Sequence, residues 1–255
     1  MLRFSANLSV LFGERPLLER FALARAQGFL GVEMQDPYEV PAAILARTAQ
    51  DAGVRTVLIN APMGAGGSPG IACRPECRAQ FSSALERACE YAAALQVPCV
   101  NVLAGRAAPA ELAGCEQLLA ENLRLAATQL AKANARVLLE PINPYDVPGY
   151  CVASFEQAQR LLRACPGVGL QFDIYHAARL GLDPADSFER LLPHIAHVQF
   201  ADCPGRHEPG TGALAFGAIF AAIAASDYQG WVGAEYRPSG DTLASLGWLR
   251  GSARQ

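Results

Sequence analysis

Residues 170–176 read LQFDIYH, and the interpretation of the whole chain depends on how this stretch is read. An apolar, strand-like run that starts at Val168 ends on the carboxylate of Asp173, and His176 follows three residues later. Taken alone, an aspartate after a strand is often the N-terminal cap of the next helix. The alternative is a functional carboxylate, and it gains support if the neighbouring strands end in the same way.

Short apolar runs alternate with amphipathic stretches along the chain, and apolar runs of this kind are typical of parallel strands covered on both faces. Strands are predicted at 3–6, 31–34, 55–59, 99–102, 136–139, 168–172, 195–200 and 231–234. Helices are predicted at 16–27, 41–52, 78–95, 116–133, 154–164, 187–192, 216–226 and 242–251. Eight such units predict an α/β fold, a single (β/α)8 TIM barrel domain over residues 1–255.

The main competing architecture is an open, doubly wound sheet. That fold favours a glycine-rich phosphate loop after the first strand, and FSANLSVLFG at 4–13 is not one. The glycine-rich stretch 61–70 lies where a long β–α loop belongs, so no linker is expected. Local signals support the helices, since Pro16 suits a first turn, and Ser154 and either Asp241 or Thr242 suit N-caps.

Composition and charge argue against several classes of protein. Hydrophobic residues make up 51% of the 255 residues, enough for a substantial core, and the net charge is −3. The 21 lysines and arginines form no basic run, so neither nucleic acid nor an anionic membrane is an expected partner. No window approaches the ~20 apolar residues of a membrane span. The N-terminus is not typical of a secretory signal, so a cytoplasmic location is expected.

The eight cysteines form no CxxC pair. Cys73 and Cys77 are four residues apart, but no second pair completes a zinc site. Reduced thiols are therefore expected, with neither a disulfide nor a structural metal. The high apolar content permits a homo-oligomer without demonstrating one.

Oxygen-bearing side chains recur where the predicted strands end, which is where the active site of such a barrel lies. Four consecutive strands deliver Glu140, Asp173, Gln199 and Glu235. Three converging carboxylates repel one another unless some are protonated or a cation neutralises them. Because an all-oxygen donor set is hard, the pattern predicts a Mg²⁺ or Mn²⁺ site with positions left open for substrate oxygens.

Further polar residues surround this set. Glu33 ends the second strand, where it could support the site, touch substrate or do neither. His197 lies two residues before Gln199, so it should point inward one layer deeper. The loop 201–212 is restricted by glycine and proline, and it carries Arg206 and Glu208 as candidates for binding substrate. An arginine can hold a carboxylate through two hydrogen bonds, whereas the alternative is a solvated charged loop.

A metal between Glu140 and Glu235 would hold a carbonyl and a neighbouring hydroxyl, and it would acidify the adjacent C–H. One glutamate could remove that proton, and the same or the opposite one could return it. The outcome is either a 1,2-isomerisation through an enediolate or an epimerisation, and the residues leave both open. A barrel that binds a ligand without catalysis is a third possibility.

The whole chain resembles the hydroxypyruvate isomerase family, within the xylose isomerase-like TIM barrels. The similar segments are RFSANLSVLFGE (3–14), GFLGVEMQDPY (28–38), LLEPINPYDVPGY (138–150), LQFDIYH, HVQFADCPGRHEPGTG (197–212) and SDYQGWVGAEYRP (226–238). The resemblance implies a metal-dependent aldose–ketose type isomerase that interconverts hydroxypyruvate and tartronate semialdehyde, a small hydroxy-oxo acid. A 2-oxo-tetronate isomerase and a ketose 3-epimerase are the alternatives from the same superfamily.

The resemblance also implies roles for particular residues. Glu140 and Glu235 match the acid–base pair and are metal ligands, while Asp173 and Gln199 complete the metal shell. His176 and Arg206 match positions that contact substrate in related epimerases. The chain departs from the family after the third strand, where INAPMGAGGSPGIAC (59–73) is shorter and carries no acid. A metal endonuclease of the same superfamily fits poorly with an acidic chain that has few histidines.

Overall fold

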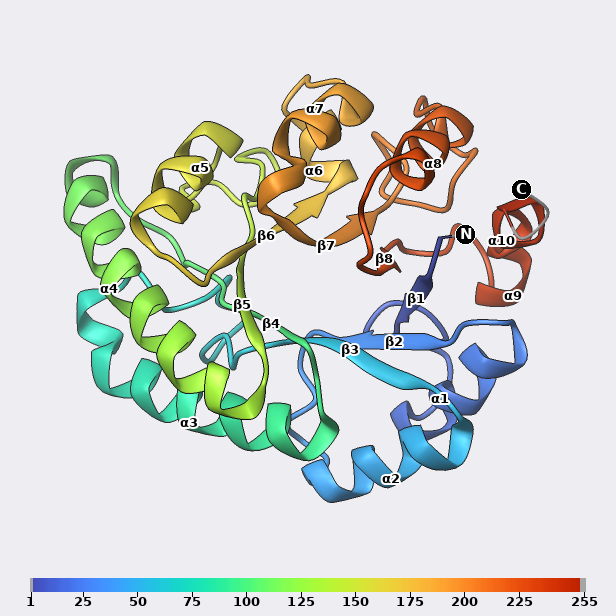
Figure 1. Ribbon diagram of the computed structural model, residues 1–255, viewed down its shortest axis with the longest axis horizontal. Coiled ribbons are helices and arrows are strands. Elements are labelled where there is room, and N and C mark those ends of the chain that lie inside the picture. Colours follow the sequence, from blue (N-terminus) through green and yellow to red (C-terminus); the bar gives the residue numbers. More distant parts are fainter. Residues whose placement is uncertain (1, 253–255) are drawn as a thin grey trace.

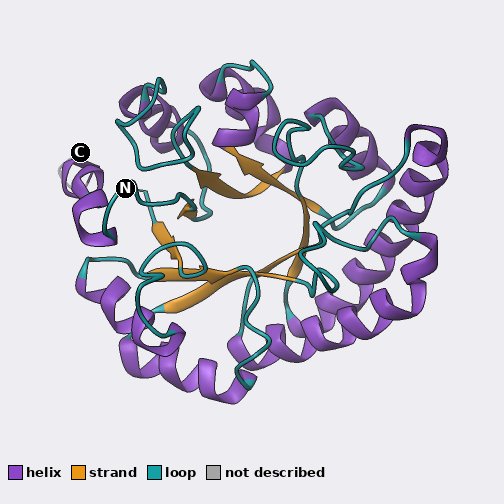
Figure 2. Cartoon of the chain, turned by 180° about the vertical axis from the view of Figure 1, so that it is seen from behind, coloured by secondary structure: helices purple, strands orange, loops and turns teal. Residues whose placement is uncertain are grey.

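The eight apolar runs form parallel strands that close into one barrel in chain order, each strand pairing with the next and β8 with β1. The computed structural model describes residues 2–252. The strands are β1 Phe4–Asn7, β2 Gly31–Met34, β3 Arg55–Asn60, β4 Cys99–Asn101, β5 Arg136–Leu139, β6 Gly169–Asp173, β7 Ile195–Phe200 and β8 Val232–Ala234. Helices surround this ring of strands (Figures 1 and 2). The predicted (β/α)8 fold is confirmed.

The helices follow the predicted alternation with a few differences. They are α1 Leu17–Ala26, α2 Ala42–Ala52, α3 Arg78–Leu95, α4 Leu112–Leu130, α5 Phe155–Ala164, α6 Ile174–Arg179, α7 Pro184–Leu191, α8 Phe216–Ala225, α9 Thr242–Ser245 and α10 Gly247–Ser252. The helix predicted from 187 begins at Pro184, because Asp183 caps it by accepting the backbone N–H groups of Ala185 and Asp186. The helix predicted at 242–251 is two short helices.

The short helix α6, directly after β6, is absent from the sequence prediction. Six residues are too few to show an apolar period of 3.6, so no helix is predicted between the strand at 168–172 and the helix at 187–192. Its cap is Asp173, whose Oδ1 accepts the backbone N–H of Tyr175 at 2.8 Å. The first interpretation of LQFDIYH, a helix cap, is therefore correct. Ser154 and Asp241 also cap their helices as predicted.

The two ends of the barrel interior differ in polarity. Leu58, Cys99 and Leu138 form a small buried apolar cluster inside the ring, with Ala196 packed against it. Most apolar side chains instead fill the layer between strands and helices. The interior beyond the small cluster, toward the carboxyl ends of the strands, is lined by polar side chains. That end of the barrel is where the site lies.

Two further expectations can be compared with the structure. All eight cysteines are free thiols, as expected. Across residues 2–252, no helix combines the length and the apolar character that crossing a bilayer requires.

Candidate active site

The carboxyl ends of the strands bring the four predicted donors into one buried network. Glu140 follows β5, Asp173 ends β6, Gln199 lies in β7 and Glu235 follows β8. Each is at most 6% exposed. Parallel strands end at the same edge of the barrel, so residues that are up to 95 positions apart in sequence meet here. The convergence inferred from the sequence is present, although the roles of the four residues stay predictions.

Glu140 has few polar partners for a buried carboxylate. Its Oε2 accepts a hydrogen bond from Asn101 Nδ2 at 2.8 Å, and its Oε1 lies 3.8 Å from His176 Nε2. Burial raises the pKa of Glu140 well above its usual value, and the negative charges of Glu235 and Asp173 raise it further. Without a cation nearby, this carboxyl therefore favours its protonated form.

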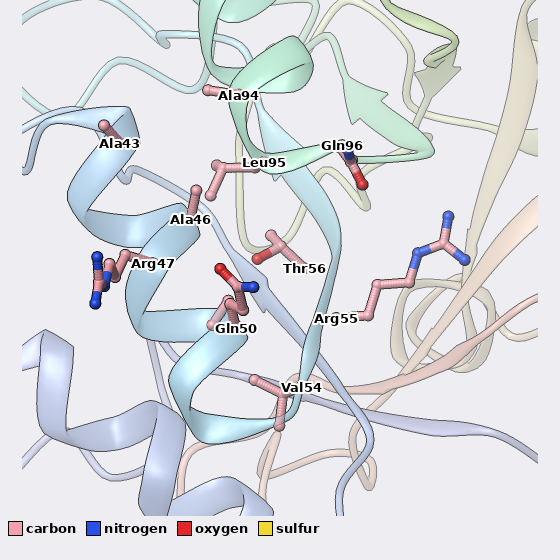
Figure 3. Close-up of a pocket in the computed structure, with 11 residues that line it drawn as sticks. Ala43, Ala46, Arg47, Gln50, Val54, Arg55, Thr56, Ala94, Leu95 and Gln96 are labelled. Atoms are coloured by element: carbon pink, nitrogen blue, oxygen red, sulfur yellow. The ribbon is translucent and has the colours of Figure 1, made fainter.

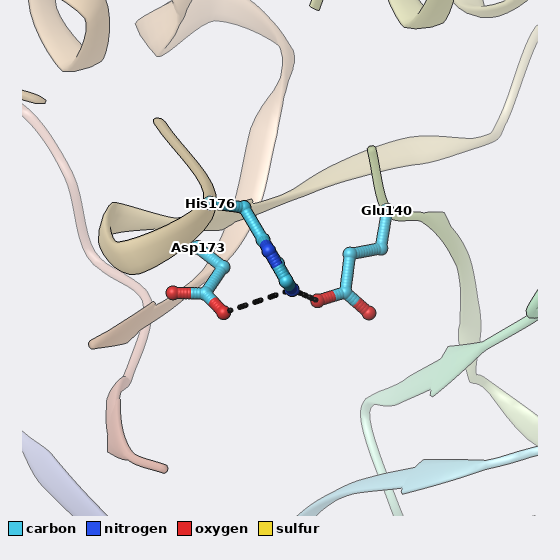
Figure 4. A group of neighbouring side chains, drawn as sticks. All are labelled: Glu140, Asp173 and His176. Atoms are coloured by element: carbon cyan, nitrogen blue, oxygen red, sulfur yellow. Dashed lines mark ion pairs between the residues drawn. The ribbon is translucent and has the colours of Figure 1, made fainter. Parts of the chain in front are cut away.

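Asp173 divides its two oxygens between two environments. Oδ1 caps α6, whereas Oδ2 lies 3.5 Å from His176 Nε2 and 3.5 Å from the Arg206 guanidinium. Within the part of the chain that the structure describes, this buried Oδ2 accepts no hydrogen bond. Burial raises the pKa of Asp173, and Arg206 opposes that shift. Figure 4 shows this oxygen facing the imidazole of His176, and its lone pairs are available to a cation.

Glu235 is held from several sides. Its Oε2 accepts a hydrogen bond from Arg206 at 2.8 Å. Its Oε1 accepts from the side-chain amides of Asn7 (2.9 Å), Gln35 (2.7 Å) and Gln199 (3.2 Å). Burial raises the pKa of Glu235 to about 7, with Arg206 acting in the opposite direction and Asp173 in the same one. A carboxyl that titrates near neutrality suits proton transfer.

Arg206 reaches the acids from a loop built around one buried carboxylate. Asp202 accepts four backbone N–H groups, from Cys203 and Leu214 on Oδ1 and from Gly210 and Gly212 on Oδ2. The Arg206 guanidinium lies 4.9 Å from the centre of the Tyr175 ring. Burial would lower the pKa of Arg206, but Glu235 and Asp173 raise it, so the guanidinium stays charged.

Glu208, the second candidate on this loop, faces Ser239. Its carboxylate accepts hydrogen bonds from the backbone N–H of Ser239 at 3.0 Å and from the Ser239 hydroxyl. These bonds connect loop 201–212 to the segment after β8. Contact between Glu208 and substrate stays a prediction, whereas its role in connecting two loops is observed.

Below this network lies a buried pair that the sequence left undecided. Glu33 is fully buried, and its Oε2 is 2.6 Å from His197 Nε2. Its Oε1 accepts from Gln199 Nε2 at 3.1 Å. The Gln199 amide thus turns its nitrogen to Glu33 and Glu235, while its oxygen accepts from Gln171. For Gln199 to bind a cation through its amide oxygen, as predicted, the amide must make half a turn so that its oxygen and nitrogen exchange places.

The residues present fit a divalent cation. One atom from each of Glu140, Asp173 and His176 lies within 4.8 Å of the other two (Figure 4). The network holds the carboxyls of Glu140, Asp173 and Glu235 beside the guanidinium of Arg206, and among the described residues Asp173 Oδ2 accepts no hydrogen bond. A cation would allow these buried acids to ionise together. Two alternative sets of metal ligands are therefore possible, and both contain Glu140 and Asp173. One set adds His176, and the other adds Gln199 and Glu235.

Several polar residues of the site were missed by the sequence analysis. They are Asn7, Gln35, Asn101 and Asn143. Asn7 and Asn101 are the last residues of β1 and β4, so the same strand-end rule that singled out the acids would have found them. Gln35 and Asn143 lie in loops, where the sequence carries no such signal.

A separate groove lies elsewhere on the molecule. It has a volume of about 730 Å³ and is lined by α2, the end of α3 and the start of β3, including Arg55 and Thr56 (Figure 3). The start of a barrel strand is the end opposite the carboxylates. The groove therefore contributes nothing to the candidate active site.

Comparison with known proteins agrees with the fold. The xylose isomerase-like TIM barrel family matches residues 21–252. Escherichia coli (strain K12) hydroxypyruvate isomerase is 41% identical, and Cupriavidus necator 2-oxo-tetronate isomerase is 39% identical, each alignment covering 98% of both chains. The crystal structure of a family 2 AP endonuclease from Brucella melitensis superposes with a TM-score of 0.95 at 37% identity, covering 98% of this chain and 99% of that one. This chain belongs to the hydroxypyruvate isomerase family of the xylose isomerase-like TIM barrels.

Proposed function

We propose that the protein is an aldose–ketose type isomerase that interconverts hydroxypyruvate and tartronate semialdehyde (2-hydroxy-3-oxopropanoate). The observation that carries the proposal is the pair of buried glutamates, Glu140 and Glu235, in one network with raised pKa values. The curated relative that bears this activity in its name is aligned over nearly the full chain. Two buried carboxyls with raised pKa values suit a reaction that moves one proton between adjacent carbons.

A divalent cation, Mg²⁺ or Mn²⁺, would be held by Glu140, Asp173, Gln199 and Glu235, and it would polarise the substrate carbonyl and so acidify the neighbouring C–H. Supporting this proposal are the oxygen-rich donor set and Asp173 Oδ2, which accepts no hydrogen bond among the described residues. Neighbouring side chains already hold the other two carboxylates in place, as Asn101 holds Glu140, whereas the Gln199 amide must turn to present its oxygen.

The proton transfer uses residues of the chain. One of Glu140 and Glu235 removes a proton from C3 of hydroxypyruvate, which leaves an enediolate with negative charge on the C2 oxygen. The proton of the C3 hydroxyl then moves to the C2 oxygen, which leaves the aldehyde at C3, and the same or the opposite glutamate returns a proton to C2. The formula is unchanged, as an isomerisation requires. Burial of both carboxyls keeps bulk water away from the reacting carbons.

The substrate is bound by cationic and donor groups at the same edge. Arg206, which lies between Glu235 and Asp173, would take the substrate carboxylate, and His176 would donate to a substrate oxygen. A small hydroxy-oxo acid is the partner that these groups suit, rather than nucleic acid, because the net charge of −3 offers no basic track. A cytoplasmic location and self-association are further parts of the proposal.

A second candidate function is isomerisation of 2-oxo-tetronate, which has one more carbon. It is favoured by the 39% identity to the Cupriavidus necator relative that bears this name. The two substrates share the carboxylate and the adjacent carbonyl, so the same residues would serve either one. The difference lies in the space beyond C3.

The test is a substrate panel assayed with EDTA and with added Mg²⁺ or Mn²⁺. Hydroxypyruvate should yield tartronate semialdehyde, measured through a coupled reductase, and EDTA should abolish turnover. Faster turnover of 2-oxo-tetronate would replace the first proposal by the second. Turnover of neutral ketohexoses alone would identify an epimerase, and no turnover of any substrate would leave a binding barrel.

A further inference from the structure

The side-chain amide of Asn143, in the loop after β5, has its orientation fixed by backbone groups. Its Oδ1 accepts the backbone N–H groups of Tyr145 at 3.1 Å and of Asp146 at 3.0 Å. Backbone N–H groups can only donate, so the atom they reach is the oxygen, and the other terminal atom is the NH₂ group. Asn143 is fully buried, which leaves no solvent to replace these bonds.

The NH₂ group of Asn143 has two hydrogens and two acceptors. One hydrogen goes to Asp146 Oδ2 at 3.1 Å and the other to His176 Nδ1 at 2.7 Å. The backbone N–H of Asn143 also points to His176 Nδ1, at 3.5 Å. Both groups that reach this ring nitrogen are donors, so Nδ1 must present its lone pair. The ring proton of a neutral imidazole is then on Nε2.

The Nε2 atom of His176 faces the carboxylates, 3.5 Å from Asp173 Oδ2 and 3.8 Å from Glu140 Oε1 (Figure 4). A nitrogen that carries a proton is a hydrogen-bond donor and cannot at the same time offer a lone pair to a cation.

We propose that Asn143 is a positioning residue that holds His176 in the Nε2–H tautomer, which makes the imidazole a donor to a substrate oxygen instead of a metal ligand. The proposal chooses between the two donor sets, leaving the cation to Glu140, Asp173, Gln199 and Glu235. Its catalytic part rests on the proposed function, since the oxygen that gains negative charge belongs to the enediolate. Its structural part depends only on the bonds just described.

The tautomer is measured by long-range ¹H–¹⁵N correlation spectra of the histidine side chains in ¹⁵N-labelled protein. The chain has four histidines, so the His176 signals are those lost in the His176→Gln variant. We expect wild-type His176 to carry its proton on Nε2, both with EDTA and with added Mg²⁺. Asn143→Asp should move the proton to Nδ1, because a carboxylate at this place can only accept. Combining Asn143→Asp with Asp146→Asn removes the repulsion between the two carboxylates, so this pair keeps the test available if the single variant misfolds.

Asp146→Asn alone is the matched control, because it leaves the Asn143 donor in place, and it should keep the proton on Nε2. In the activity assay, losing the donor should lower kcat/KM by about 10²–10³-fold, as for removal of one oxyanion donor. The proposal is overturned if wild-type His176 carries its proton on Nδ1, or if both variants with Asn143→Asp keep it on Nε2. Because the spectra need no turnover, inactivity on hydroxypyruvate would overturn the proposed function and leave the tautomer assignment in place.

Discussion

Asp173 shows how one residue serves two purposes. Its Oδ1 caps α6, while its Oδ2 is buried without a hydrogen-bond donor among the described residues. The two interpretations of an aspartate at a strand end, helix cap and functional carboxylate, are compatible because a carboxylate has two oxygens. The cap also fixes the rotamer of Asp173, so Oδ2 already points into the site. Binding a cation or substrate there then costs little side-chain conformational entropy.

The two glutamates can be tested at the residue scale by isosteric substitution. Glu140→Gln or Glu235→Gln should each lower kcat by about 10²–10⁴-fold, since an amide cannot exchange the proton that a positioned carboxyl transfers. Assays at saturating Mg²⁺ with circular dichroism separate this effect from lost metal or lost fold. Glu189→Gln, an exposed position on α7, is the control and should retain full activity. Retained turnover in both active-site variants would rule out the proton-transfer role.

A glycine in β8 gives a prediction about stability. A Cβ added at Gly233 would lie 2.3 Å from Glu33 Oε1, so this position admits only glycine while Glu33 stays bound to His197. Gly233→Ala should lower the free energy of unfolding by about 2–3 kcal/mol, as overpacking does, in urea titrations. Gly217→Ala, in α8 with open space around the added carbon, should be neutral or stabilise by up to about 1 kcal/mol. Equal effects at both glycines would contradict the close approach to Glu33.

At the scale of elements, the loop after β7 is organised by Asp202, which is 1% exposed and accepts four backbone N–H groups. Asp202→Ala should destabilise the protein by about 2–4 kcal/mol, because several buried donors lose a charged acceptor. It should also raise KM by releasing Arg206. Asp183→Ala, which removes the α7 cap, should cost about 1 kcal/mol and leave KM unchanged. Thermal unfolding and steady-state kinetics measure both, and an unchanged KM in Asp202→Ala would show that the loop does not position Arg206.

The elements were predictable where their signal is local and repeated. Eight apolar runs bounded by polar residues predict the barrel, and the barrel predicts that Glu140, Asp173, Gln199 and Glu235 converge. The helix α6 escaped because six residues carry too little periodicity. The orientation of the Gln199 amide escaped for a different reason, since it depends on Glu33 and Gln171 from other strands. Contacts between strands depend on which residues lie opposite one another in the barrel. The pairing of β6 with β7 shifts between Leu170 and Gln171, so it cannot be counted out along the sequence.

For the whole molecule, closing the barrel concentrates carboxyl groups at one end of its interior. Arg206 offsets part of their negative charge, and the pKa values of Glu140, Asp173 and Glu235 are all raised. Ionising these buried carboxyls in the folded chain therefore costs free energy, and a bound cation would lower that cost. That cost links stability to both pH and metal.

The sign of this linkage can be worked out from Glu235. Its pKa is raised from an ordinary value of 4.5 to about 7, so between these values the folded chain holds a proton that the unfolded chain has released. This group's contribution to stability is therefore fully present below about pH 4.5 and is lost as pH rises through 7. A cation binds the ionised carboxyls and so restores stability mainly at high pH.

We expect the rise in Tm on replacing EDTA with Mn²⁺ to be larger at pH 8 than at pH 5. At a hundredfold excess over Kd the stabilisation is about 2.7 kcal/mol, which differential scanning fluorimetry resolves. A rise in Tm that is equal at both pH values, or larger at pH 5, would show that these carboxyls do not bind the cation.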